Sequence, residues 1–141
     1  MIRLAALAFA SLVTAASAQA SPVPEGLWSL SKGKVQVRIV ACGEALCATV
    51  AGLAKPNDKQ GRPKVDKRNP NPALRERRVI GISLLSGMKA DAGGWSGNFY
   101  NPDDGETYAG RIEQGGDGKL RLKGCVLGGL ICKTQVLTRI G

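Results

Sequence analysis

The chain has 141 residues, with 20 Lys and Arg, 11 Asp and Glu and no His. The absence of histidine excludes Ser–His–Asp hydrolases, Cys–His proteases, HExxH metalloproteases and any histidine-based pH switch. When a predicted export signal of 20 residues is set aside, 121 residues remain, enough for one domain with a single hydrophobic core.

Residues Met1–Ala20 have the three parts of a secretory signal peptide. Arg3 supplies the positive start, Leu4–Val13 is apolar, and Ala18-Gln19-Ala20 is a small-x-small cleavage site. The apolar run is about half the length of a membrane span, so a membrane anchor is the weaker interpretation. We expect a single mature domain over 21–141, with no transmembrane segment, in an oxidising compartment such as the bacterial periplasm.

Eight segments with strand character follow one another along the mature chain. In Lys34–Val40, for example, apolar and polar residues alternate as in a half-buried strand. Many short strands joined by tight turns, without strand–helix alternation, favour a single antiparallel barrel or sandwich. The segments are Gly26–Ser31, Lys34–Val40, Leu46–Leu53, Val79–Leu85, Gly94–Tyr100, Glu106–Glu113, Lys119–Cys125 and Cys132–Ile140.

The four cysteines all follow the signal, and hairpin geometry favours the pairs Cys42–Cys47 and Cys125–Cys132. A turn at Glu44-Ala45 places the first pair directly opposite, and a turn at Gly128-Gly129 does the same for the second. Opposed strand residues lie within disulfide reach, and an oxidising compartment favours disulfides over a four-cysteine zinc site. We expect no metal and no cofactor.

The stretch Lys55–Arg78 carries nine Lys or Arg residues, three acidic residues and four of the seven prolines. We expect it to be irregular, with one short helical turn at Pro72–Arg75. Its charge suits an anionic envelope component such as lipopolysaccharide phosphates or lipid headgroups, although a solvated loop remains the alternative. It has no aromatic residues for stacking bases, so we expect no nucleic-acid partner.

Two sets of motifs carry a resemblance to known families. Gly26-Leu27-Trp28 and Thr138-Arg139-Ile140 are similar to the first and last strands of lipocalins and related calycin barrels. That resemblance implies that Trp28 and Arg139 close the barrel through a cation–π contact. The longer set is Asp66-x-x-Asn69-Pro70-x-Pro72-Ala73-Leu74-Arg75-x-Arg77, Trp95-Ser96-Gly97 and Tyr100-Asn101-Pro102-Asp103-Asp104-Gly105-x-Thr107-Tyr108.

Together with the first cysteine pair, the longer set resembles the exported bacterial family called domain of unknown function 2147, from Gly26 to Arg139. The resemblance implies an all-β fold: a small antiparallel lipocalin-like β-barrel of about eight strands. It implies no established activity and no established catalytic residues.

The candidate ligand-binding residues each have a structural alternative. Asp66, Asn69 and Arg75 either contact a ligand at the barrel mouth or fix a local turn, with Arg75 paired to a carboxylate. The aromatic residues either line an apolar pocket or form a filled core. The candidates are Asp66, Asn69, Arg75, Arg77, Trp95, Tyr100 and Tyr108.

The leading functional hypothesis is a periplasmic binding protein for a small apolar or amphipathic ligand, such as a fatty acid or lipid. The alternative is an exported interaction protein, such as a periplasmic protease inhibitor or an envelope anion-binding module. The arm Ser21–Glu25 is short for reaching a protease cleft. No nucleophile–base pair and no metal motif is visible, so we do not expect an enzyme. The acidic cluster at Asp103-Asp104 and Glu106 is interpreted as a turn.

Overall fold

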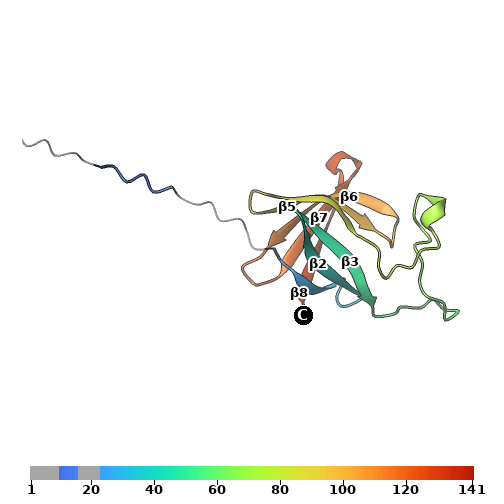
Figure 1. The fold of residues 1–141 in the computed structure, drawn as a ribbon. Coiled ribbons are helices and arrows are strands. Elements are labelled where there is room, and N and C mark those ends of the chain that lie inside the picture. Colours follow the sequence, from blue (N-terminus) through green and yellow to red (C-terminus); the bar gives the residue numbers. More distant parts are fainter. Residues whose placement is uncertain (1–9, 16–22) are drawn as a thin grey trace, which may run out of the picture.

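The computed structural model describes residues 10–15 and 23–141. Eight antiparallel strands, each paired with the next along the chain, form one closed barrel, which confirms the predicted fold class (Figure 1). The strands are β1 (Gly26–Leu30), β2 (Val35–Cys42), β3 (Ala45–Leu53), β4 (Leu85–Asp91), β5 (Gly94–Asn101), β6 (Glu106–Gln114), β7 (Leu120–Val126) and β8 (Ile131–Arg139).

The predicted export signal falls mostly outside the described residues. Residues 10–15 of it are described and have no regular secondary structure, whereas the predicted cleavage site Ala18-Gln19-Ala20 lies outside the described ranges. In the part of the chain that the structure describes, no helix has the length and apolarity needed to cross a membrane.

The barrel has two different ends, because the strand connections alternate between them. We call the end with connections 31–34, 54–84, 102–105 and 127–130 the open end. The closed end has the turns 43–44, 92–93 and 115–119 and the N-terminal segment 23–25.

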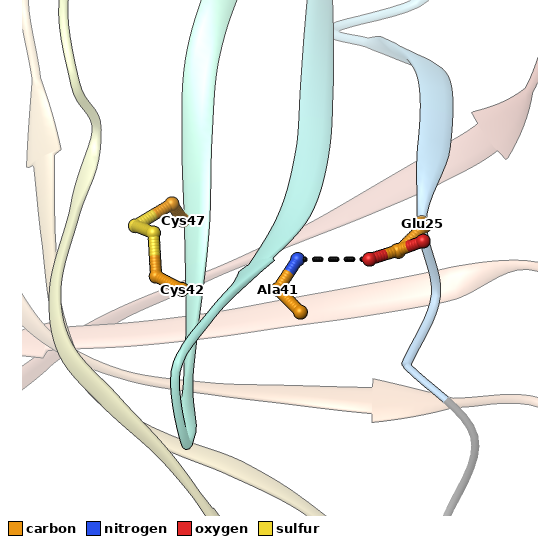
Figure 2. The surroundings of a disulfide bond; sticks show 4 residues. All are labelled: Glu25, Ala41, Cys42 and Cys47. Carbon is orange, nitrogen blue, oxygen red and sulfur yellow. Dashed lines mark hydrogen bonds between the residues drawn. A yellow bond between two sulfur atoms is a disulfide. The ribbon is translucent and has the colours of Figure 1, made fainter.

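The closed end is sealed around Trp28, which is 2% exposed. Trp28 pairs with Arg139 where β1 meets β8, and the Arg139 guanidinium lies 4.4 Å from the centre of the indole ring. The indole Nε1 donates to the Pro24 carbonyl at 3.0 Å, and Arg139 Nη1 donates to the Glu25 carbonyl at 2.6 Å. Glu25 Oε1 in turn accepts from the Ala41 amide at 3.1 Å (Figure 2). The segment before β1 is therefore fixed across the closed end.

The first hairpin has the predicted disulfide but a different register. The turn lies at Gly43-Glu44, not at Glu44-Ala45, so that Ala45 lies opposite Cys42. Cys47 is two residues further along the same face, and the disulfide is therefore diagonal, with the two Cα atoms 5.6 Å apart (Figure 2). The physical reason is Gly43, which takes a φ of 59° at the first turn position, where hairpins favour glycine.

The second hairpin also has its predicted disulfide, with Cys125 directly opposite Cys132. Its tip is longer than the predicted two-residue turn. A short 3₁₀ turn, η2 (Leu127–Gly129), joins the strands, so Leu127 and Leu130 are not paired as strand residues.

The predicted strand Val79–Leu85 is wrong. The chain reverses at Gly81, which has a φ of 100°, and β4 begins only at Leu85. The segment before β4 still lies against β3, because the amides of Gly81 and Leu84 donate to β3 carbonyls. The strand β4 escaped prediction because only Leu85 and Met88 are buried in it, and its register shifts around Gly87.

The residues 54–84, which we call the basic strap, connect β3 to β4 and extend from the open end (green in Figure 1). The stretch is irregular as predicted, with one helical turn, η1 (Pro72–Leu74). Asn71 caps this turn by accepting from the Ala73 amide at 3.1 Å.

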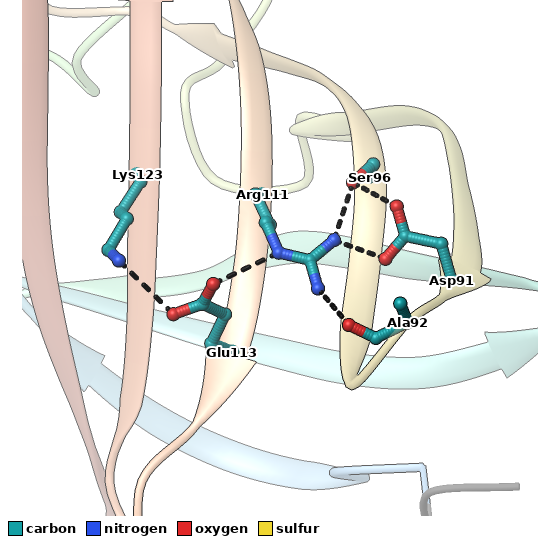
Figure 3. A network of polar contacts seen from close by, with 6 residues as sticks. All are labelled: Asp91, Ala92, Ser96, Arg111, Glu113 and Lys123. Atoms are coloured by element: carbon teal, nitrogen blue, oxygen red, sulfur yellow. Dashed lines mark hydrogen bonds and ion pairs between the residues drawn. The ribbon is translucent and has the colours of Figure 1, made fainter.

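A polar network braces the outer wall near the closed end (Figure 3). Arg111 on β6 binds Asp91 at the β4–β5 turn and donates to Glu113 Oε1 at 3.0 Å. Ser96 donates to Asp91 at 2.6 Å, and Lys123 on β7 donates to Glu113 at 3.2 Å. The network joins the neighbouring strands β4, β5, β6 and β7. We therefore interpret it as structural.

Candidate ligand-binding site

Asp66 is the centre of a buried polar network within the basic strap. Its side chain is 0% exposed and both carboxylate oxygens are satisfied. Oδ2 accepts from Asn69 Nδ2 at 2.8 Å and from Arg77 Nε at 2.9 Å. Oδ1 accepts from the Tyr100 hydroxyl at 2.6 Å. The network ties the strap to β5, since a buried carboxylate is stable only when it is paired and hydrogen-bonded.

Tyr100 contributes to this network from outside the barrel. Its neighbour Phe99 is buried in the core, and strand residues alternate between faces, so Tyr100 points outward and the strap covers it. Burial and the hydrogen bond to the Asp66 carboxylate raise the pKa of Tyr100 to about 12. The Arg77 guanidinium also lies over the ring, 5.8 Å from its centre.

Arg75 has a partner other than the predicted carboxylate. Its Nε donates to the Asn69 carbonyl at 2.8 Å, while the Asp66 carboxylate pairs with Arg77. Asn69 is 5% exposed and its Oδ1 caps the Asn71 amide at 2.8 Å. These contacts correct the predicted ion pair and describe a turn held by side chain–backbone hydrogen bonds.

Tyr108 belongs to a second cluster, inside the open end. Its hydroxyl donates to Asp104 Oδ2 at 2.5 Å, and the Lys133 ammonium lies 5.5 Å from the ring centre and 3.5 Å from the same carboxylate oxygen. Burial opposes ionisation of Asp104, but the hydrogen bonds from Tyr108 and the Glu106 amide outweigh it and lower its pKa. The hydrogen bond to Asp104 and burial together raise the pKa of Tyr108.

Of the predicted candidates, the structure brings together Asp66, Asn69, Arg77 and Tyr100, with Arg75 beside them. Trp95 lies apart from these residues. It is 3% exposed in the core and sits one residue from the start of β5, near the closed end.

The interior of the barrel is filled. Apolar side chains from all the strands meet along the axis, and the cavities lined by them measure about 20 to 50 Å³, room for no more than a few water molecules. Phe99 and Tyr108 contribute to this packing, with ring centres 6.4 Å apart. The interior cavities are therefore too small for a lipid-like ligand.

Larger cavities lie at the open end, between the strap and the barrel rim. Two of them, of about 370 and 340 Å³, share Lys64, Val79 and Asp103 and together form what we call the strap groove. Ligand pockets in proteins span roughly 300–1,000 Å³, so each is of suitable size. The lining is Lys34, Val35, Leu53, Ala54, Lys55, Asp58, Lys64, Val65, Lys67, Arg68, Val79, Pro102 and Asp103.

The strap groove combines apolar walls with an excess of positive charge. Its lining has five cationic residues, and among the described residues none of the five takes part in an ion pair. Of its two acidic residues, Asp58 is already paired with Arg62 at 3.2 Å. The other, Asp103, is exposed and lines both cavities.

The strap packs closely against the rim where its backbone at Arg68 meets the backbone of the β5–β6 connection at Gly105. Gly105 takes a φ of 74°, and a Cβ there would collide with the Arg68 carbonyl oxygen. Glycine thus allows the β5–β6 connection to pack against the strap. The charge of the strap predicts an anion site, but the groove itself was not predictable, because Lys34, Leu53 and Pro102 come from three other connections or strands.

The family model described as "Uncharacterized protein conserved in bacteria (DUF2147)" matches residues 26–139. The chain belongs to this family. A solved structure described as "Protein HP1028 from the human pathogen Helicobacter pylori belongs to the lipocalin family" is similar, at 26% sequence identity and a TM-score of 0.69. The similarity covers 84% of this chain and 83% of that chain. Among curated proteins, none matches the chain.

These comparisons confirm the predicted family and the lipocalin-like barrel. The two disulfides are also present as predicted, and they are typical of an oxidising compartment. No group of three or more His, Cys, Asp or Glu residues suited to a metal is found within residues 10–15 and 23–141.

Proposed function

We propose that the protein binds a small amphipathic anion, such as a fatty acid or a single-chain phospholipid, in the strap groove, and that it does so in the periplasm. The observation that carries the proposal is the composition of the groove: apolar walls at the barrel rim surrounded by unpaired cations. An acyl chain would lie against Val35, Leu53 and Val79, while an acidic headgroup would meet Lys64 and Lys67.

The proposal moves the ligand from the barrel axis to the open end. The lipocalin-like fold supports a role in binding small ligands, by analogy of fold alone. The filled interior argues against a ligand held along the axis. Arg75 and Arg77, two of the predicted ligand-binding residues, already bind the Asn69 carbonyl and Asp66, so the lysines of the groove are better placed to meet an acidic headgroup.

The alternative of a protease inhibitor acting through an N-terminal arm is less favoured. Pro24 and Glu25 are held against the closed end by Trp28 and Arg139 and are therefore not free to enter a cleft.

Isothermal titration calorimetry with decyl phosphate, decanol and inorganic phosphate tests this function. We expect decyl phosphate to bind more tightly than either of the others, because only decyl phosphate has both the chain and the charge. Each methylene added to the chain should raise the affinity by up to about fourfold while the chain remains within the groove.

The double substitution Lys64→Gln with Lys67→Gln should weaken decyl phosphate binding by about three- to tenfold. The matched control is Lys89→Gln with Lys119→Gln, which removes the same charge near the closed end. The proposed function is wrong if decyl phosphate does not bind, or if both double variants bind it as well as the unmodified protein does.

A further inference from the structure

The tip of the β7–β8 hairpin exposes large apolar side chains at the open end. Leu127 and Leu130 are 68% and 85% exposed, and Ile131 beside them is 49% exposed. A Cβ added to Gly128 or Gly129 would meet no atom within 4 Å, so no other described part of the chain covers the tip. Apolar side chains gathered at one exposed point mark a contact with a partner.

The backbone of the tip has a defined conformation. Leu127, Gly128 and Gly129 have φ values of 54°, 64° and 94°, three consecutive residues in the left-handed region. This conformation is unfavourable for leucine, because its Cβ approaches the carbonyl oxygen. The Cys125–Cys132 disulfide joins the two strands just below the tip. Leu127 is thus held in an unfavourable backbone conformation, and both Leu127 and Leu130 are exposed at the tip.

The charge of the molecule is concentrated at the same end. The open-end connections (31–34, 54–84, 102–105 and 127–130) contain eleven Lys or Arg residues and five Asp or Glu residues. The closed-end segments (23–25, 43–44, 92–93 and 115–119) contain one Lys and three acidic residues. The apolar tip and the basic strap therefore extend from the same end of the barrel (Figure 1).

We propose that the open end docks on an anionic lipid bilayer, with Leu127 and Leu130 inserted at the interface and the basic strap against the headgroups. Interfacial binding of this kind needs both apolar insertion and cations, because either contribution alone gives weak attachment. The β3–β4 and β7–β8 connections leave opposite sides of the barrel, so the two contacts flank its mouth.

A bilayer fits these observations better than a protein partner. The eleven cations of the open end lie in the connections 31–34 and 54–84, nine of them along the basic strap. An extended row of cations suits a uniformly charged surface, whereas a protein partner would match a more local pattern. Docking does not depend on the ligand proposed above, but it would place the strap groove at the membrane surface.

Cosedimentation with vesicles tests the docking. The exported form of the protein, with both disulfides formed, is mixed with vesicles of phosphatidylcholine alone or of phosphatidylcholine and phosphatidylglycerol. We expect at least about tenfold stronger binding to the anionic vesicles, weakened by added salt. Leu127→Ser with Leu130→Ser should lower that binding about tenfold.

The matched control is Val40→Ser with Ile140→Ser, which removes two partly exposed apolar side chains near the closed end and should leave vesicle binding unchanged. Near-ultraviolet circular dichroism shows that each variant is folded. As an independent readout, Leu130→Trp adds an indole that brominated lipids should quench, whereas the buried Trp28 and Trp95 should not respond.

Any one of three vesicle results would overturn the docking proposal. These are equal binding to both vesicle types, tip variants that bind as well as the unmodified protein, and an indole at position 130 that brominated lipids do not quench. Tip-dependent capture of an envelope protein without vesicle binding would assign the tip to a protein partner and would also overturn the lipid proposal.

Discussion

Tyr100 donates its hydroxyl hydrogen to the buried carboxylate of Asp66, with the two oxygens 2.6 Å apart. The contact joins β5 to the middle of the basic strap, across 34 residues of sequence. Because Arg77 and Asn69 bind the other carboxylate oxygen, the strap is held at the barrel by one small network. The shape of the strap groove depends on this attachment.

We predict that Tyr100→Phe lowers the free energy of unfolding by about 1–3 kcal/mol, because Asp66 then loses a hydrogen bond in a buried place. Asp66→Asn should cost a similar amount, about 1–3 kcal/mol, since it weakens the charge-assisted hydrogen bonds to Arg77, whose partly exposed guanidinium water can still solvate. Urea unfolding followed by far-ultraviolet circular dichroism measures both. A Tyr100→Phe variant as stable as the unmodified protein would show that the network does not hold the strap.

The ionisation of Tyr100 provides a second prediction. Its pKa of about 12 in the folded protein lies above the ordinary value of 10, so folding favours the protonated hydroxyl. The resulting stability is complete below pH 10 and is lost as the pH rises from 10 to about 12.

Absorbance of the tyrosinate ion measures this titration. The chain has two tyrosines, and the Tyr100→Phe variant isolates the signal of Tyr108, whose pKa is also raised. The difference between the two titrations is the signal of Tyr100. If Tyr100 ionises near its ordinary pKa in the folded protein, the buried hydrogen bond to Asp66 is contradicted.

At the closed end, Arg139→Ala should destabilise the barrel by about 1–3 kcal/mol. The substitution removes the guanidinium over Trp28 and the hydrogen bond to the Glu25 carbonyl. The control Arg121→Ala removes an exposed arginine paired with Asp117 and should cost no more than about 0.5 kcal/mol. Thermal unfolding compares the two variants. Equal losses of stability would show that Arg139 does not contribute to closing the barrel.

Within the strap groove, Asp103→Asn should strengthen the binding of decyl phosphate by about two- to fivefold, because Asp103 is the acidic residue of the lining without an ion-pair partner among the described residues. Glu106→Gln removes a nearby negative charge that does not line the groove and should have a smaller effect. If the two variants bind equally, the headgroup does not lie beside Asp103.

Short strands and tight turns in the sequence predicted an antiparallel barrel or sandwich, and the family resemblance implied the barrel that the structure has. Segments with strand character between turn signals marked seven of the eight strands, and turn residues identified both disulfides. The fourth strand was misplaced, because Val79–Leu85 is apolar but reverses at Gly81. The first hairpin was shifted by one residue, since a glycine next to a cysteine did not reveal which pair of residues forms the turn.

The candidate site was less predictable, because it depends on contacts between distant segments. The motif residues Asp66, Asn69 and Arg77 were found together, but their role as a buried attachment appeared only when Tyr100 was seen to point outward. The strap groove combines residues from β1–β2, β3, the strap and β5–β6. No local pattern in the sequence predicts such a lining.

The proposed function depends on one event, the binding of an amphipathic anion between the strap and the barrel rim. Amide chemical shifts, recorded by nuclear magnetic resonance while decyl phosphate is added, test it most directly. If the anion binds there, the largest changes occur at Lys64, Val79 and Asp103, which both cavities of the groove share. Changes centred on Ile112 and Leu137 in the barrel interior, or no changes at all, would contradict it.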